Sequence, residues 1–300
     1  MSIKAHPPHN HALHVPVLLD RTLELLRPQT GESYLDLTAG YGGHASAVIE
    51  RTQNPLGAVL VDRDENAIKE LQALQDKGAK LLHTDFVTAA KQLVEQNERF
   101  SMILVDLGVS SPQLDRAERG FSFSKDGPLD MRMDPSAKKS ASVIVNRASE
   151  DDLYRIIVEY GEESRGFARR IAHAIVRNRP FDTTKQLADL ILSEHYGKWQ
   201  RIHPATRTFQ ALRIATNDEL GQVEEILPLL PKLLQKGGRV AVISFHSLED
   251  RLVKRYFKEE SQSGLEAELE IVTKKPDEGS LYDVHNPRSR SAKLRVAVKK

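Results

Sequence analysis

A glycine-rich run, followed at a distance by an aspartate, is the clearest chemical signal in this sequence. The run Gly40–Gly43 follows the apolar stretch 34–38 and precedes a predicted helix near 45–50. Glycine permits positive φ and lets a ligand approach backbone that a Cβ would block. A second apolar run, 58–61, ends in Asp62, whose carboxylate can accept hydrogen bonds from a ribose diol, as in nucleotide-binding βαβ units. The pattern predicts a site for a nucleoside-type cofactor.

These residues leave the choice of cofactor open. Gly40, Gly42 and Ala45 also fit the looser dinucleotide pattern G-x-G-x-x-A, which suits NAD. S-adenosylmethionine would use the same glycines for close backbone approach and Asp62 for its ribose. A plain surface turn with a solvated acid is the remaining interpretation, and it gives the distant aspartate no role.

Asp106 is the candidate catalytic residue. It ends the apolar run 101–105 and is followed by the polar, proline-containing loop 107–115. The carboxyl ends of such strands are where ligands of open α/β sheets bind. An exocyclic amine is a weak nucleophile because its lone pair is delocalised into the ring. It therefore needs a hydrogen-bond acceptor and close alignment with an electrophilic methyl group, which an acid at this edge can provide. A helix cap or loop acid is the alternative role for this residue.

Composition restricts the chemistry further. The 300 residues carry a net charge of +1, so affinity for nucleic acid must come from local basic patches. The absence of cysteine excludes disulfides, thiolate metal sites and the thiolate catalysis usual in methylation of pyrimidine carbon 5. No segment approaches the length of a membrane span, and a cytoplasmic protein is expected. His6, His9, His11 and His14 crowd the N-terminus, but no acid or helix fixes their geometry, so no metal site is expected.

The order of the elements predicts the architecture. Apolar, strand-like runs recur at 34–38, 58–62, 79–83, 100–106, 239–244, 268–273 and 294–298. The first of these runs alternate with helical patterns, which indicates a doubly wound, Rossmann-like α/β sheet. Amphipathic helices without a convincing strand fill the gap before 239. We therefore predict one α/β domain from residues 1–110 and 216–300, interrupted by a helical substrate-recognition domain over 111–215.

Blocks spread along nearly the whole chain resemble one known family. They are His14–Leu19, Asp36–His44, Asp62–Asp64, Asp106–Asp115, Arg119–Phe123, Gly127–Met133, His203–Ile214, Ile243–Arg251 and Asn286–Arg295. In this order they resemble the bacterial 16S ribosomal RNA cytosine-N4 methyltransferases. The resemblance implies a methyltransferase sheet, S-adenosylmethionine as cofactor, and cytosine 1402 in the decoding region of the small subunit as target. Ala39 departs slightly, since larger apolar residues are common there.

The resemblance also implies site residues. The cofactor contacts are Gly42, Gly43, His44, Asp62, Phe86, Asp106 and Gln113. Among them, Phe86 is expected beside the adenine, because it follows the strand-like run 79–83; a packing role in the core is the alternative.

Candidate RNA contacts come from two regions. His246 follows the strand 239–244, and arginines alternate with small residues in the tail formed by Arg288, Arg290, Lys293 and Arg295. A basic stripe on the predicted helix 165–177 is a second candidate surface. An NAD(P)-dependent oxidoreductase and a ribosome assembly factor without turnover are the alternative functions. The sequence leaves homo-oligomerisation open.

Overall fold

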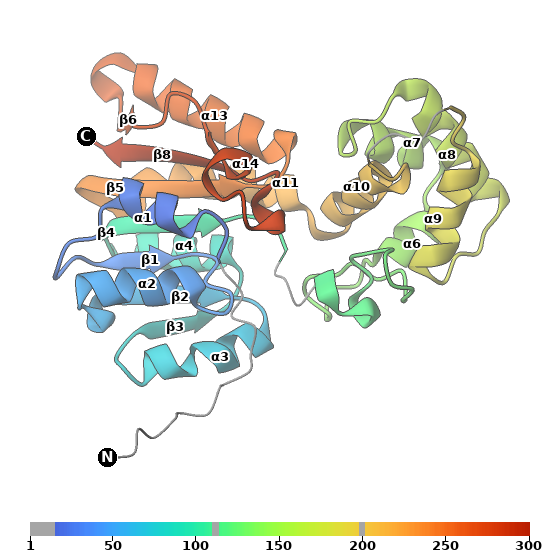
Figure 1. Cartoon of the computed structure of the whole chain (residues 1–300). Helices are drawn as coiled ribbons and strands as arrows, with labels where there is room; N and C mark the ends of the chain where they lie inside the picture. The colour runs from blue at the N-terminus through green and yellow to red at the C-terminus, as the bar shows by residue number, and fades with distance from the viewer. Residues whose placement is uncertain (1–15, 110–113, 198–201) are drawn as a thin grey trace.

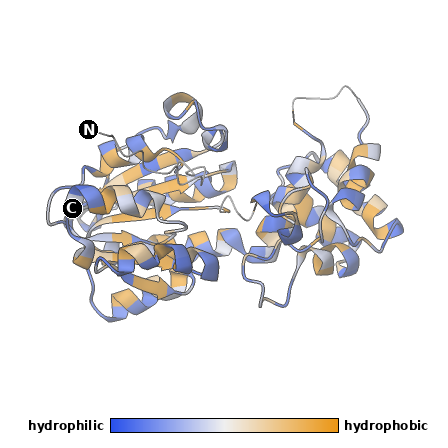
Figure 2. Cartoon of the chain, turned by 60° about the horizontal axis from the view of Figure 1, so that its bottom comes forward, coloured by the Kyte–Doolittle hydropathy of each residue, from blue (hydrophilic) through white to orange (hydrophobic). Residues whose placement is uncertain are grey.

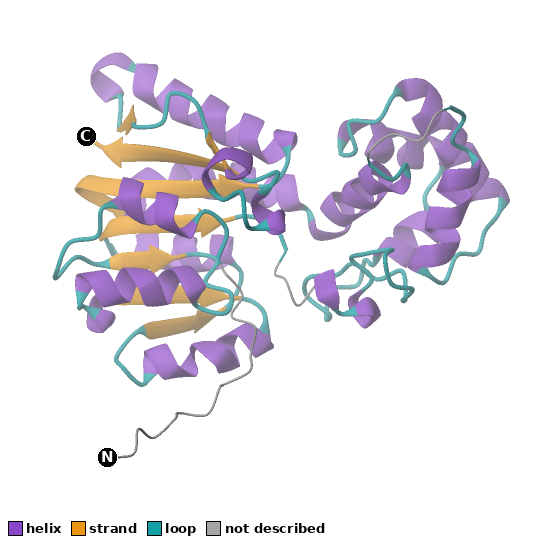
Figure 3. Cartoon of the chain, in the orientation of Figure 1, coloured by secondary structure: helices purple, strands orange, loops and turns teal. Residues whose placement is uncertain are grey.

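A computed structural model describes residues 16–109, 114–197 and 202–300. The predicted cluster His6–His14 and the predicted contact Gln113 lie outside these ranges. Figure 1 and Figure 3 show a twisted sheet with helices on both faces, and a second group of helices beside it. Among the described residues, no helix is both long enough and apolar enough to cross a bilayer.

The described strands form one eight-stranded sheet. They are β1 (Tyr34–Asp36), β2 (Ala58–Asp62), β3 (Lys80–His83), β4 (Phe100–Asp106), β5 (Leu234–Ser244), β6 (Leu269–Ile271), β7 (Asp277–Glu278) and β8 (Lys293–Lys299). Their order is β3-β2-β1-β4-β5-β8-β6, with β7 paired to β8. Strands β1 to β5 run parallel, and β6, β7 and β8 pair antiparallel. This confirms the predicted Rossmann-like, doubly wound sheet, whose strand order reverses between β1 and β4.

Two apolar cores lie on opposite faces of this sheet. Helices α1 (Leu19–Leu26), α2 (Gly43–Thr52) and α3 (Glu65–Gln75) cover one face. Helices α4 (Phe86–Glu95), α11 (Glu219–Ile226), α12 (Leu230–Leu233) and α13 (Ser247–Gln262) cover the other. Strand β4 shows why both faces need cover, because Met102 and Leu104 join the first core while Ile103 and Val105 join the second. Figure 2 accordingly shows mostly hydrophobic strands between amphipathic helices.

The helices beside the sheet pack on a third core of their own. They are α6 (Ala141–Arg147), α7 (Glu150–Glu159), α8 (Arg165–Arg177), α9 (Thr184–Ser193) and α10 (Ala205–Asn217). On α8, Phe167 and Ile171 point into this core, and the arginines of the predicted basic stripe are exposed. An ion pair joins this group of helices to α13, which covers the sheet. In it, Glu162 accepts a hydrogen bond of 2.8 Å from Arg251. The helical part therefore has an independent core and direct contacts with the sheet.

Some predicted strand limits differ from those observed. The first strand ends at Asp36 rather than at residue 38, because the Thr38 N–H turns back to donate to the Asp36 carboxylate (3.1 Å). Strand β5 begins at Leu234, five residues before the predicted start, and passes through Gly237 at φ +74°. The apolar pattern marks the buried middle of a strand and misses exposed ends of this kind.

Candidate active site

The reversal of strand order brings the ends of β1 and β4 together. Asp36 ends β1 and Asp106 ends β4, and the loops that follow are tied to each other. The backbone N–H of Asp106 donates to the Thr38 hydroxyl at 2.6 Å, and Leu37 N–H donates to the Leu104 carbonyl at 3.0 Å. Open α/β sheets bind ligands at this kind of switch point. Asp106 thus lies at the edge where the sequence predicted it.

The glycine loop runs from β1 to α2 along the same edge. Gly40 and Gly42 have φ values of +52° and +79°, which side chains rarely adopt. A Cβ at Gly42 would lie 2.9 Å from Leu71 on α3, and one at Gly43 would lie 2.3 Å from Pro16. Packing inside the chain is therefore sufficient to require both glycines. Their contact with a cofactor stays a prediction, supported by their place at the strand ends.

Asp62 ties the glycine loop to the end of β2. Its carboxylate accepts hydrogen bonds from the backbone N–H groups of Gly40 and Asp64, each at 2.8 Å. Burial raises the pKa of Asp62, although these hydrogen bonds oppose the rise. A carboxylate offers about four acceptor positions, so lone pairs stay available for a ribose diol.

Two further carboxylates lie beside this loop, of which Asp36 is buried and Asp106 is partly buried. Asp36 is 1% exposed, and burial raises its pKa to about 7 despite a hydrogen bond from the Tyr34 hydroxyl (2.8 Å). Burial also raises the pKa of Asp106 well above its usual value, and the negative charges of Asp36 and Glu249 add to the rise. The Asp106 Oδ1 atom is buried without a hydrogen-bond partner among the described residues. His44 at the start of α2 brings its Nε2 to 3.9 Å from Asp106 Oδ2.

This edge of the sheet is therefore acidic and favours a positively charged ligand. Burial disfavours the ionised form of Asp36, Asp62 and Asp106 and raises the pKa of each, and a nearby cation would oppose that rise. The sulfonium of S-adenosylmethionine is such a cation, so these carboxylates fit that cofactor.

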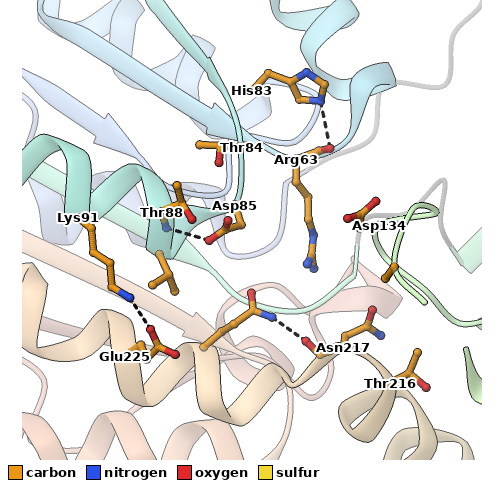
Figure 4. A pocket seen from close by; sticks show the side chains of 13 residues that line it. Arg63, His83, Thr84, Asp85, Thr88, Lys91, Asp134, Thr216, Asn217 and Glu225 are labelled. Carbon is orange, nitrogen blue, oxygen red and sulfur yellow. Dashed lines mark hydrogen bonds and ion pairs between the residues drawn. The ribbon is translucent and has the colours of Figure 1, made fainter. Parts of the chain in front are cut away.

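A cavity of about 640 Å³ lies between the sheet and the helical part, and its lining includes Arg63, Asp85 and Val87, the chain neighbours of Asp62 and Phe86. Figure 4 shows Arg63 pointing into it, between Asp85 on one side and Asp134 and Asn217 on the other. Phe86, the first residue of α4, is partly buried against the core. Burial lowers the pKa of Arg63, and no carboxylate of the described residues lies within ion-pair distance of it. Arg63 was not among the site residues predicted from the sequence, although it stands within the block Asp62–Asp64.

A buried charged network at the end of β5 was also missed. His246 begins α13 as its N-cap, with its Nε2 3.2 Å from the Glu249 carboxylate. Burial opposes ionisation of Glu249, but its contact with His246 and the charge of Arg213 outweigh this and lower its pKa. Arg213 on α10 holds both oxygens of Glu219, at 2.8 and 2.7 Å. The ligand atoms of Glu219, His246 and Glu249 lie within 4.8 Å of one another, but Arg213 already occupies Glu219, so we propose no metal there.

The predicted RNA contacts do not share one environment. Arg288 is paired with Asp115 at 2.8 Å, and Arg290 is exposed. Lys293 lies 3.5 Å from Asp250. Arg295 requires a correction, because it is only 6% exposed and its guanidinium binds the Asp250 carboxylate at 2.6 and 3.2 Å. A buried, paired arginine stabilises the sheet and cannot reach an RNA strand.

The doubly wound sheet, with a glycine loop and three acids at the carboxyl ends of β1, β2 and β4, defines a Rossmann-like methyltransferase fold. The chain belongs to the MraW methylase family, whose model matches residues 11–300.

Several relatives are similar over almost their whole length, and each is named ribosomal RNA small subunit methyltransferase H. The protein of Acidobacterium capsulatum is 48% identical over 299 residues, covering 96% of this chain and 98% of the relative. That of Synechocystis is 47% identical over 297 residues, covering 95% and 93%. That of Citrifermentans bemidjiense is 46% identical over 309 residues, covering 95% and 98%. The resemblance found in the sequence is confirmed.

Proposed function

We propose that this protein transfers a methyl group from S-adenosylmethionine to the N4 amine of cytosine 1402 in 16S ribosomal RNA. Family membership supports the reaction class. The observation in the structure that carries the proposal is that Asp36, Asp62 and Asp106, all with raised pKa values, end the neighbouring strands β1, β2 and β4 at the edge where the strand order reverses. Membership of the MraW methylase family argues against an NAD(P)-dependent oxidoreductase. The unpartnered Asp106 Oδ1 argues for turnover rather than a purely structural assembly role.

The chain offers a separate residue for each end of the cofactor. Asp62 accepts hydrogen bonds from the ribose, and Phe86 lies beside the adenine. The loop Gly42–His44 brings its backbone close to the cofactor. Bound here, S-adenosylmethionine supplies an electrophilic methyl group on a positively charged sulfur. Both the buried orphan oxygen of Asp106 and the left-handed glycine loop fit such a ligand. Gln113 is carried over from the family resemblance alone.

Asp106 is the group that we assign to the amine. As the N4 lone pair forms a bond to the methyl carbon, the bond from that carbon to sulfur breaks and neutral S-adenosylhomocysteine is left, while the nitrogen becomes positive and loses a proton. A carboxylate within hydrogen-bond reach stabilises that charge and accepts the proton. His44, 3.9 Å away, is placed to orient the Asp106 carboxylate. The reaction needs mainly alignment and one acceptor, and both are available at the end of β4.

The helical part is proposed to recognise the RNA. We place this domain at 111–215, and the exposed arginines of α8 support the assignment because they can contact phosphates. The assembled small subunit is the proposed form of the substrate, and the cytoplasm is the proposed location because bacterial ribosomal subunits are assembled there.

The choice of cofactor can be tested by thermal shift. S-adenosylmethionine is expected to raise the melting temperature and NAD to leave it unchanged, since a ligand that binds only the folded state stabilises it. A shift produced by NAD alone would overturn the cofactor assignment.

The same measurement should depend on pH. Below a pKa of about 7 Asp36 is protonated, and it ionises as the pH rises, so affinity for the cationic cofactor should increase from pH 6 to pH 8. S-adenosylhomocysteine, which lacks the sulfonium charge, serves as the matched ligand, and its affinity should vary less. Asp36→Asn should flatten the dependence. Equal pH profiles for the two ligands would contradict the electrostatic argument.

A further inference from the structure

A second, smaller pocket of about 260 Å³ lies at the end of β5. Phe245 and Ser247, on either side of the N-cap of α13, form one wall, and Arg290 and Lys293 form another. The second wall is held in place by the sheet, because Lys293 at the start of β8 pairs with Glu278 of β7. The pocket is thus built by segments separated by about forty residues in the sequence and fixed by strand pairing.

This pocket adjoins the loop that follows Asp106. The Leu107 N–H donates to the Ile243 carbonyl at 2.9 Å, which aligns the end of β4 with the end of β5. Two residues beyond Ile243, the ring of Phe245 is so close that a Cβ at Gly108 would lie 3.1 Å from it. Phe245 therefore contacts both the loop after Asp106 and the pocket. The ring of Phe245 would therefore separate a group bound in the pocket from that loop.

The charges around the pocket favour an anion. Among the described residues, Arg290 makes no hydrogen bond or ion pair, and its side chain is exposed at the rim. Lys293 lies 3.5 Å from Asp250, but Arg295 already neutralises that acid with two hydrogen bonds. Within the described ranges, Glu278 is the one acid that lines the pocket, so this lining carries a surplus of positive charge. Cations next to an aromatic ring are typical of sites for single-stranded nucleic acid.

We propose that this pocket binds the nucleotide adjacent to the target cytosine, with Arg290 and Lys293 on its phosphate and Phe245 against its base or ribose. The assignment rests on the proposed function, because it takes the Asp106 edge as the position of the target amine. It selects Arg290 and Lys293 from the predicted basic tail as contacts close to the reaction, and it leaves Arg288 paired with Asp115.

Binding of small ribosomal subunits that lack the methyl group tests the pocket. Arg290→Gln is expected to weaken binding roughly tenfold, the scale of a lost charged hydrogen bond. The slope of log affinity against log salt should fall by about 0.7, as for one phosphate contact on a single strand. Arg290→Lys should retain most of the affinity. Arg99→Gln is the matched control, since Arg99 is exposed at the opposite edge of the sheet, directly before β4.

The outcomes separate this proposal from the proposed function. If the wild-type protein methylates the subunits while Arg290→Gln and Arg99→Gln bind equally well, the pocket assignment is wrong and the function stands. If the wild-type protein transfers no methyl group, the function itself fails. A photo-crosslinking amino acid at position 290 should react with RNA next to the target cytosine. A crosslink to a ribosomal protein or to a distant RNA segment would overturn the assignment.

Discussion

Asp106→Asn is expected to lower the methyl-transfer rate at saturating substrates by roughly 100-fold or more, the usual range for a positioned acid–base group. Asparagine keeps the size of the side chain and one acceptor oxygen but removes the charge that stabilises the developing cation on N4. Affinity for S-adenosylmethionine should fall less than the rate, because Asp36 and Asp62 keep the site acidic and the interaction of Asp106 with N4 is made mainly in the transition state. Single-turnover rates and cofactor titrations measure the two effects separately.

The fold should tolerate this substitution. The Asp106 Oδ1 atom has no hydrogen-bond partner among the described residues, and the pKa of Asp106 is raised by burial and by the charges of Asp36 and Glu249. Removing a buried charge of this kind should leave the melting temperature unchanged or raise it. If saturating cofactor restores the rate of the variant, Asp106 is only a cofactor ligand and its assignment to the amine is wrong.

Asp62→Ala is expected to weaken S-adenosylmethionine binding by ~1.5–3 kcal/mol, the scale for hydrogen bonds to a charged group. The change removes the ribose acceptor and also the bonds that hold the N–H groups of Gly40 and Asp64. Because the loop is loosened at the same time, the effect should lie towards the upper end of that range. Isothermal titration of the cofactor measures it directly.

Asp64→Ala is the matched control for this prediction. Asp64 lies two residues away and caps α3 by accepting from the Asn66 N–H at 2.9 Å, so its loss weakens a helix end without removing the ribose acceptor. The control should lose stability and keep its affinity for the cofactor. Equal loss of affinity in both variants would show that loop order, rather than the Asp62 carboxylate, determines binding.

The sequence predicted the parts of this site that depend on strand ends. Asp62 and Asp106 were found because an apolar run that stops at an acid marks the carboxyl edge of a parallel sheet. The glycine loop was found for the same reason, since only glycine adopts φ near +79° without strain, as at Gly42. Asp36 lies in an equivalent place, but its burial beneath the loop depends on how β1 packs against β4, which no local pattern shows.

The parts that were missed depend on contacts between distant segments. Arg295 reads as one of a row of exposed basic residues, and only the pairing of β8 with β5 turns it inward towards Asp250. The network of Arg213, Glu219 and Glu249 joins α10, α11 and α13, which lie side by side only after the helical part folds back onto the sheet. Charge and spacing in the sequence do not reveal such partners.

The position of the methyl group in the product tests the central claim most directly. Small ribosomal subunits that lack the modification would be incubated with the protein and labelled S-adenosylmethionine, and their RNA digested with nuclease and analysed by mass spectrometry. We predict label on N4 of a single cytosine, at position 1402 of 16S ribosomal RNA. Label on carbon 5 of a cytosine, on an adenine, or nowhere in the RNA would contradict the account.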